Sequence, residues 1–111
     1  MQLGELQSLM AATYGERDGP RGVSASVAWL CEEVGELAQA IRKGTRAQQQ
    51  LEFADVLAWI ATLANQVGVD LDQAISIYSL GCPKCSTMPC GCPPPPTVDP
   101  ATIRVGGQPA S

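Results

Sequence analysis

Two apolar seams with helical spacing, separated by a very short connection, constrain the fold of this chain more than any other feature. Intervals of three and four residues place side chains on one face of an α-helix. The first seam consists of Val27, Leu30, Val34, Leu37 and Ile41. The second consists of Phe53, Val56, Leu57, Ile60, Leu63, Ala64 and Val67. Because only residues 44–48 connect the two stretches, we predict an antiparallel helical hairpin with buried seams.

Shorter helices are expected on both sides of this hairpin. Apolar residues at helical spacing over residues 3–14 indicate a first helix, which Gly15, Gly19, Pro20 and Gly22 are expected to end. Ser24 or Ser26 is the expected N-cap of the next helix, and Asp70 is expected to cap a short fourth one. No strand-like alternation is long enough for a sheet. The predicted fold is therefore all-α, with the hairpin extended to a four-helix bundle.

The chain divides by composition into three segments. Residues 1–80 carry the helical patterns, residues 81–92 are rich in Cys, and residues 93–111 are rich in Pro and Gly. The last segment has too few large apolar residues to offset the entropy of ordering, so we expect a flexible tail. A domain of this size buries only a limited fraction of its surface. We therefore expect a homodimer or homotetramer to complete the bundle.

Charge and composition exclude several classes of function. Eleven Asp and Glu against seven Lys and Arg give a formal charge of −4, which leaves no basic field for a nucleic-acid polymer. The absence of His excludes a His-dependent triad and a His-ligated metal. Residues 1–14 lack the basic start of a secretory signal, and no apolar run approaches the ~20 residues of a membrane span. We expect a soluble, cytoplasmic protein without a membrane partner.

Five acidic residues lie beside the two seams. The first predicted helix carries Glu32, Glu33 and Glu36 on one stripe, and the second carries Glu52 and Asp55. In an antiparallel hairpin, positions equally far from the connection lie level, so the two acidic rows should meet. Such crowding of like charge destabilises a compact state unless a cation neutralises it. Mg²⁺ suits the arrangement because it binds a few carboxylates and takes its other ligands from water and phosphate.

Each predicted hairpin helix also carries a tryptophan one turn beyond its acidic row. Trp29 precedes Glu33 by four residues, and Trp59 follows Asp55 by four, so both indoles should lie farther from the connection. This order matches a nucleotide, whose phosphates would bind the metal and whose base would stack on an aromatic ring. A Trp on a helix is more often a core or interface residue, and that alternative stays open.

The spacing of the acids resembles that of a known family. Glu-Glu-x-x-Glu at residues 32–36 is followed, after fifteen intervening residues, by Glu-x-x-Asp at residues 52–55. This pattern is similar to the signature of the MazG-type all-α nucleoside triphosphate pyrophosphohydrolases. The resemblance implies Mg²⁺-dependent hydrolysis of a nucleoside triphosphate to a monophosphate and pyrophosphate, in the service of nucleotide pool cleaning. Mn²⁺ is the alternative metal.

The resemblance also implies roles for individual residues. Glu32 is the implied general base, or it orients the attacking water, and Asn65 is an implied nucleotide contact. The implied metal ligands are Glu33, Glu36, Glu52 and Asp55. Many members carry Lys directly before the Tyr of the last helix, whereas this chain has Ile77 before Tyr78. The candidates for the missing phosphate contact are Arg21, Arg42, Lys43 and Lys84.

Four of the five cysteines form a cluster before the predicted tail. Cys82-x-x-Cys85 and Cys90-x-Cys92 supply four thiolates, the number that a tetrahedral Zn²⁺ site needs. The second pair follows the first more closely than in a zinc ribbon. Two alternatives to a zinc site therefore stay open: the cysteines form disulfide or redox pairs, or they have no role. Cys31 lies among the residues of the first seam and is expected to be a small buried apolar residue.

A second class of function is compatible with the same residues. In a non-catalytic metal-binding interaction module, the acidic stripe pairs with a basic partner and the Cys cluster forms a zinc knob. The two hypotheses differ in one observable, because only the enzyme releases pyrophosphate from a nucleoside triphosphate in the presence of Mg²⁺.

Overall fold

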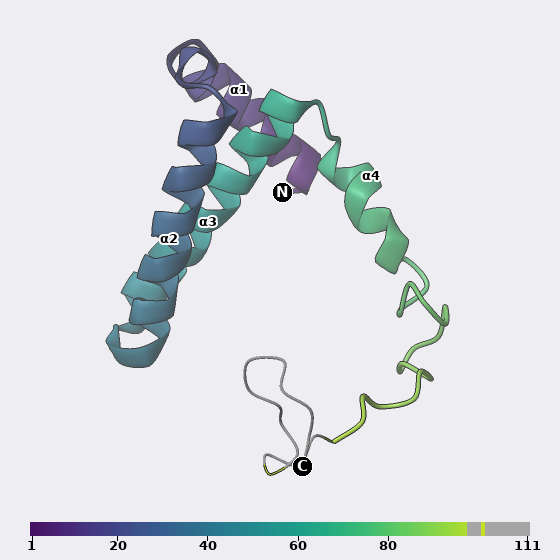
Figure 1. The fold of residues 1–111 in the computed structure, drawn as a ribbon. Helices are drawn as coiled ribbons and strands as arrows, with labels where there is room; N and C mark the ends of the chain where they lie inside the picture. The colour runs from purple at the N-terminus through teal and green to yellow at the C-terminus, as the bar shows by residue number, and fades with distance from the viewer. Residues whose placement is uncertain (98–100, 102–111) are drawn as a thin grey trace. The chain divides into compact units, whose positions relative to one another are not determined.

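The computed structural model describes residues 1–97 and 101, and within them every regular element is helical. The α-helices are α1 (Leu3–Asp18), α2 (Val23–Lys43), α3 (Arg46–Val67) and α4 (Leu71–Ile75), with short 3₁₀ helices η1 (Gly19–Arg21) and η2 (Ser76–Tyr78) (Figure 1). The prediction of an all-α fold is thereby confirmed. None of the described helices is long and apolar enough to cross a membrane.

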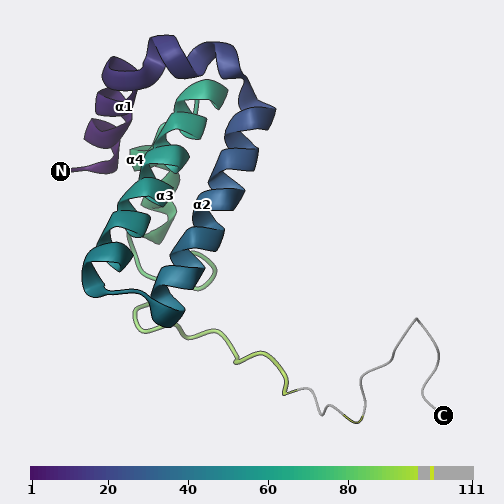
Figure 2. The ribbon, with the colours of Figure 1, turned by 90° about the vertical axis from the view of Figure 1, so that its left-hand side faces the viewer.

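The α2–α3 hairpin is the centre of the helical unit, and its two helices run side by side (Figures 1 and 2). Its connection is shorter than expected, because α3 begins directly after Thr45. The Thr45 hydroxyl accepts from the Gln48 N–H at 3.2 Å, and the Gln48 side chain accepts from the Thr45 N–H at 2.8 Å. A Cβ at Gly44 would lie 2.7 Å from the Ala40 carbonyl oxygen, so the tight turn requires glycine there.

The first helix is longer than predicted and the second starts earlier. α1 continues through Gly15, since one glycine costs only about 1 kcal/mol in a helix and the packing of α1 on α3 outweighs that cost. The expected serine caps of α2 are also wrong. Gly22 occupies the N-cap position with φ +82°, which glycine adopts without strain, and the chain therefore turns before it reaches Ser24. Ser26 is fully buried inside the helix.

The side chain of Gln7 on α1 forms hydrogen bonds to the end of α3 and the start of α4. The Gln7 side chain donates to the Val69 carbonyl at 2.8 Å and accepts from the Leu71 N–H at 2.9 Å. The Asn65 side chain donates to the Gln7 carbonyl at 2.9 Å. The expected cap of α4 is present, because the Asp70 carboxylate accepts from the N–H groups of its first turn. These polar contacts set how α1 crosses the hairpin.

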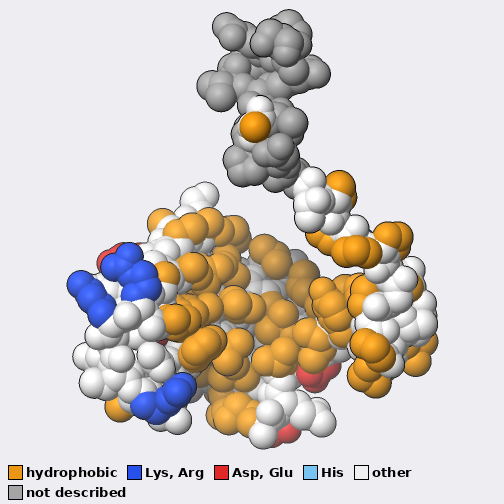
Figure 3. Space-filling view, turned by 90° about the horizontal axis from the view of Figure 1, so that it is seen from below, with side chains coloured by type: hydrophobic (Ala, Val, Ile, Leu, Met, Phe, Trp, Pro, Cys, Tyr) orange, Lys and Arg blue, Asp and Glu red, His pale blue; other side chains and the backbone are white. Residues whose placement is uncertain are grey.

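Apart from Ala64, the residues of the two predicted seams are not buried in the single chain, which corrects the sequence-based expectation. The buried apolar residues of the described chain are small alanines, Ala40, Ala61 and Ala64. Six seam residues keep 43% to 56% of their surface exposed, namely Val27, Val34, Ile41, Phe53, Leu57 and Val67. Cys31 is likewise exposed. Figure 3 shows how much of one face hydrophobic side chains cover. Within the described chain, α1 packs on α3 and leaves these seam residues uncovered.

The residue contacts divide the chain between Ser79 and Leu80, so that the helices form one unit and the Cys cluster belongs to another. The fourth predicted helix is partly confirmed, because α4 has one α-helical turn and then tightens into η2, which ends at Tyr78. Most of the predicted tail at 93–111, namely residues 98–100 and 102–111, lies outside the described residues.

Candidate active site

Three carboxylates from the two hairpin helices meet at one point. Glu33 and Glu36, one turn apart on α2, face Glu52 on α3, and one oxygen of each lies within 4.8 Å of the others. We call Glu33, Glu36 and Glu52 the acidic cluster. The level arrangement expected of an antiparallel hairpin is what brings them together.

The surroundings of Glu33 and Glu52 oppose the ionisation of these two carboxyl groups. Burial, and then the negative charges of Glu36, Asp55 and Glu52, raise the pKa of Glu33 from 4.5 to about 7. Burial and the charges of Glu36 and Asp55 raise the pKa of Glu52 as well. Oε2 of Glu33 and Oε2 of Glu52 are buried, and neither has a hydrogen-bond partner among the described residues. Buried, unsatisfied oxygens of like charge fit a divalent cation, which satisfies the oxygens and cancels the repulsion.

The other two predicted acids take different positions. Asp55 is not one of the three clustered carboxylates, but its charge raises the pKa of both Glu33 and Glu52, so it borders the cluster. Glu32 is exposed on α2 and does not belong to the cluster. The structure therefore brings three of the four predicted metal ligands together and places the fourth next to them.

The two tryptophans contact each other across the hairpin. The rings of Trp29 and Trp59 stack with centroids 6.0 Å apart and planes 5° from parallel. The Arg21 guanidinium carbon lies 5.0 Å from the centroid of the Trp59 ring, a cation–π contact. The sequence placed each indole correctly beyond its acidic row. It gave no indication that the indoles stack, because the helix-to-helix distance is a tertiary property.

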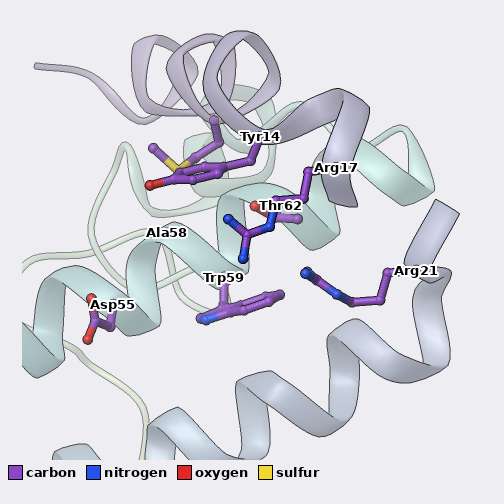
Figure 4. Close-up of a pocket in the computed structure, with 8 residues that line it drawn as sticks. Tyr14, Arg17, Arg21, Asp55, Ala58, Trp59 and Thr62 are labelled. Carbon is purple, nitrogen blue, oxygen red and sulfur yellow. The ribbon is translucent and has the colours of Figure 1, made fainter. Parts of the chain in front are cut away.

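A cavity of about 290 Å³ begins at Asp55 and extends along α3 beneath α1. Arg17 from α1 and Arg21 from η1 extend toward the ring of Trp59, and Tyr14 lies nearby (Figure 4). The lining residues are Met10, Tyr14, Arg17, Arg21, Asp55, Ala58, Trp59 and Thr62. Arg21 was among the expected phosphate contacts, whereas Arg17 and Tyr14 were missed. No spacing rule could have found them, because they reach the site only after α1 folds back over α3.

Lys43 and Asn65 have different surroundings. Lys43 shares a second cavity, of about 420 Å³, with Glu36 and Glu52 near the hairpin connection. Asn65 lies in the contact of α1 with α3, where its amide oxygen accepts from the Gln7 side chain at 3.3 Å and its nitrogen donates to the Gln7 carbonyl. The structure thus brings Lys43, but not Asn65, to a cavity that the acidic cluster borders.

The predicted cysteines also come together. Sulfurs of Cys82, Cys85, Cys90 and Cys92 all lie within 4.8 Å of one another. Hydrogen bonds from the Thr87 hydroxyl and then the Gly91 N–H lower the pKa of Cys85 to about 5.

Comparison with known proteins identifies the family of this chain. Residues 21–79 match the model of the MazG nucleotide pyrophosphohydrolase domain. A dATP/dGTP diphosphohydrolase of cyanophage S-2L is 39% identical over 71 residues, which are 64% of this chain and 64% of that protein. The uncharacterized protein YvdC of Bacillus subtilis (strain 168) is 32% identical over an alignment that covers 70% of this chain and 90% of YvdC. This chain belongs to the MazG nucleotide pyrophosphohydrolase family.

Proposed function

We propose that this protein hydrolyses a nucleoside triphosphate to a nucleoside monophosphate and pyrophosphate, with Mg²⁺ held at the acidic cluster. The observation that carries the proposal is the pair of buried, unpartnered oxygens on Glu33 and Glu52, which lie among further carboxylates. An interaction module that attracts a basic partner needs ionised acids on its surface. Burial and a raised pKa at Glu33 oppose that alternative.

The proposed metal ligands are the acidic cluster and the adjacent Asp55. Carboxylate oxygens are hard donors, which suit Mg²⁺ or Mn²⁺ rather than a thiophilic metal. When bound, the metal neutralises phosphate charge and makes a bound water more acidic. The proposed role of Glu32, which is exposed on α2 and adjoins Glu33 in the sequence, is to orient the attacking water or accept its proton. Water attacks the α-phosphorus, the bond to the bridging oxygen breaks, and pyrophosphate leaves with the electron pair.

The cavity under α1 is the proposed binding place of the nucleotide's base end. Its volume of about 290 Å³ is at the low end of ligand pockets, so it suits one end of a nucleotide rather than the whole molecule. Trp59, stacked on Trp29, supplies an aromatic surface for the base. Many family members carry a lysine at the position of Ile77, and Arg21 and Lys43 are the proposed phosphate contacts in its place. Arg21 lines the cavity that begins at Asp55, and Lys43 lines the cavity bordered by Glu36 and Glu52. Asn65 then acts by holding α1 over the cavity.

The relative from cyanophage S-2L suggests the substrate class. That protein is named for action on dATP and dGTP, and this chain spans about 64% of its length. We infer that purine deoxynucleoside triphosphates are the first substrates to test. A purine also offers the larger surface for stacking on an indole.

Self-association is the proposed completion of the fold. The exposed seam residues of α2 and α3 form apolar surface that a second copy would cover, as a homodimer or homotetramer. The raised pKa of Glu33 and the small alanine core belong to the single chain, so the proposed active site does not depend on the oligomer for its acids.

A pyrophosphate-release assay tests the proposed reaction. The full chain is incubated with Mg²⁺ and each of the canonical ribo- and deoxyribonucleoside triphosphates, and pyrophosphate is measured. We expect release from at least one of them, and its loss in Glu36→Gln and Asp55→Asn. Glu16→Gln, which removes an exposed acid of α1 outside the cluster, is the matched control and should retain activity. Folded protein that releases no pyrophosphate from any of the substrates would overturn the proposal.

A further inference from the structure

The segment after the helices has no apolar core to hold its fold. Among the described residues 80–97, none is buried, and those that are even partly covered are Gly81, Cys82, Cys85 and Cys92. A short chain that cannot form a hydrophobic core is stabilised by disulfides or by a metal. Three of the four partly covered residues are cysteines, so the side chains that this segment covers most are thiols, with Cys90 exposed beside them.

The sulfur positions match a tetrahedral metal site. In a regular ZnS₄ tetrahedron with Zn–S bonds of about 2.3 Å, neighbouring sulfurs are about 3.8 Å apart. The Sγ atoms of Cys82 and Cys92 are 3.8 Å apart, and all four sulfurs lie within 4.8 Å of one another. A disulfide needs a separation of about 2.05 Å. The four sulfurs are therefore close enough together to share one metal ion.

The backbone is arranged around these sulfurs. The Cys82 carbonyl accepts from the Ser86 N–H at 2.7 Å, and the Cys82 N–H donates to the Thr87 carbonyl at 3.0 Å, which closes a tight loop on the first pair. The Gly91 N–H donates to the Cys85 sulfur at 3.3 Å. The Cys92 N–H donates to the Cys90 sulfur at 3.4 Å. Hydrogen bonds of this kind orient thiolate ligands around a metal.

We propose that Cys82, Cys85, Cys90 and Cys92 bind one Zn²⁺ in a closed structural site. Four thiolates select a soft or borderline metal and leave no open coordination position for substrate. The site is therefore distinct in chemistry from the carboxylates proposed to hold Mg²⁺. Its role is to fold the segment that follows η2, where apolar burial is lacking.

Metal content and thiol reactivity of the full chain test this site without any activity measurement. We expect purified protein to carry one zinc per chain by elemental analysis. A chromogenic thiol reagent should react quickly only with Cys31, which is exposed on α2, until a chelator removes the zinc and the other four thiols react. Cys85→Ser and Cys90→Ser should lose zinc. Cys31→Ser is the matched control and should keep it, with no rapidly reacting thiol.

Reconstitution makes the test independent of how the variants fold. Zinc-free wild-type protein titrated with Co²⁺ should develop the visible absorption of a tetrahedral cobalt thiolate site, with saturation at one ion per chain. Zinc should then displace the cobalt. Protein that contains iron instead, that holds its cysteines as disulfides, or that gives no thiolate-type cobalt spectrum would overturn the proposal. Zinc binding in a chain without hydrolase activity would contradict the proposed function and leave the zinc site intact.

Discussion

The charge of Glu33 destabilises the metal-free protein, and Glu33→Gln should therefore make that protein more stable. The pKa of Glu33 rises from 4.5 to about 7 in the fold. At about 1.4 kcal/mol per pKa unit the full difference is roughly 3 kcal/mol, and solvent screening at this partly exposed site reduces it to about 1–2 kcal/mol. Because the folded-state pKa of an acid is raised, the destabilisation develops as pH rises from 4.5 to 7 and is complete above 7.

Urea unfolding in the presence of a chelator measures this effect at pH 5 and pH 8. We expect Glu33→Gln to exceed the wild type in unfolding free energy by about 1–2 kcal/mol at pH 8, with a much smaller gain at pH 5. The exposed neighbour Glu32 provides the control, since Glu32→Gln should change stability by no more than about 0.5 kcal/mol. Mg²⁺ should stabilise the wild type at pH 8 and have little effect on Glu33→Gln. Equal or lower stability of Glu33→Gln at pH 8 would refute the reasoning.

Four further predictions follow from other parts of the fold. Arg21→Gln should raise KM for the triphosphate about tenfold in steady-state assays, which corresponds to about 1.4 kcal/mol. The control is Arg46→Gln, at the exposed start of α3, which should leave KM unchanged. Gly44→Ala should lower the unfolding free energy by about 1–3 kcal/mol, because its Cβ meets a carbonyl oxygen of the preceding turn; no loss in thermal or urea unfolding would contradict the close approach. Gln7→Ala should cost about 1–3 kcal/mol by leaving its backbone partners unsatisfied, and hydrogen exchange should rise at the start of α4. Val34→Lys should shift the protein toward the monomer in sedimentation experiments, and an unchanged oligomer would exclude this seam from the interface.

The acidic cluster could be predicted from sequence because its geometry depends on local rules. The i, i+3 spacing of Glu33 and Glu36 fixes their common face, and the short connection fixes which residues of α3 lie level with them. The helix ends were less predictable. Gly22 starts α2 because a positive φ is available only to a few residue types, and a serine nearby gave a stronger but misleading signal.

The rest of the site depends on contacts between distant segments. The stacking of Trp29 on Trp59 depends on how closely α2 and α3 pack, whereas the position of Arg21 over the Trp59 ring depends on how α1 crosses the hairpin. The hydrogen bonds of Gln7 to the end of α3 hold α1 in that crossing, and the spacing of apolar residues in α1 does not predict them. The seam of α2 shows the same limit, since Val34 marks an apolar side but spacing does not show what covers it.

Anomalous diffraction from crystals of the full chain soaked in Mn²⁺ tests the central claim most directly. The wild type should show a manganese peak between α2 and α3, at roughly 2.1 Å from oxygens of Glu33, Glu36 and Glu52, as expected for a small hard cation. A well-ordered cluster whose three carboxylates contact no manganese, at concentrations that load other sites in the same crystal, would contradict the account.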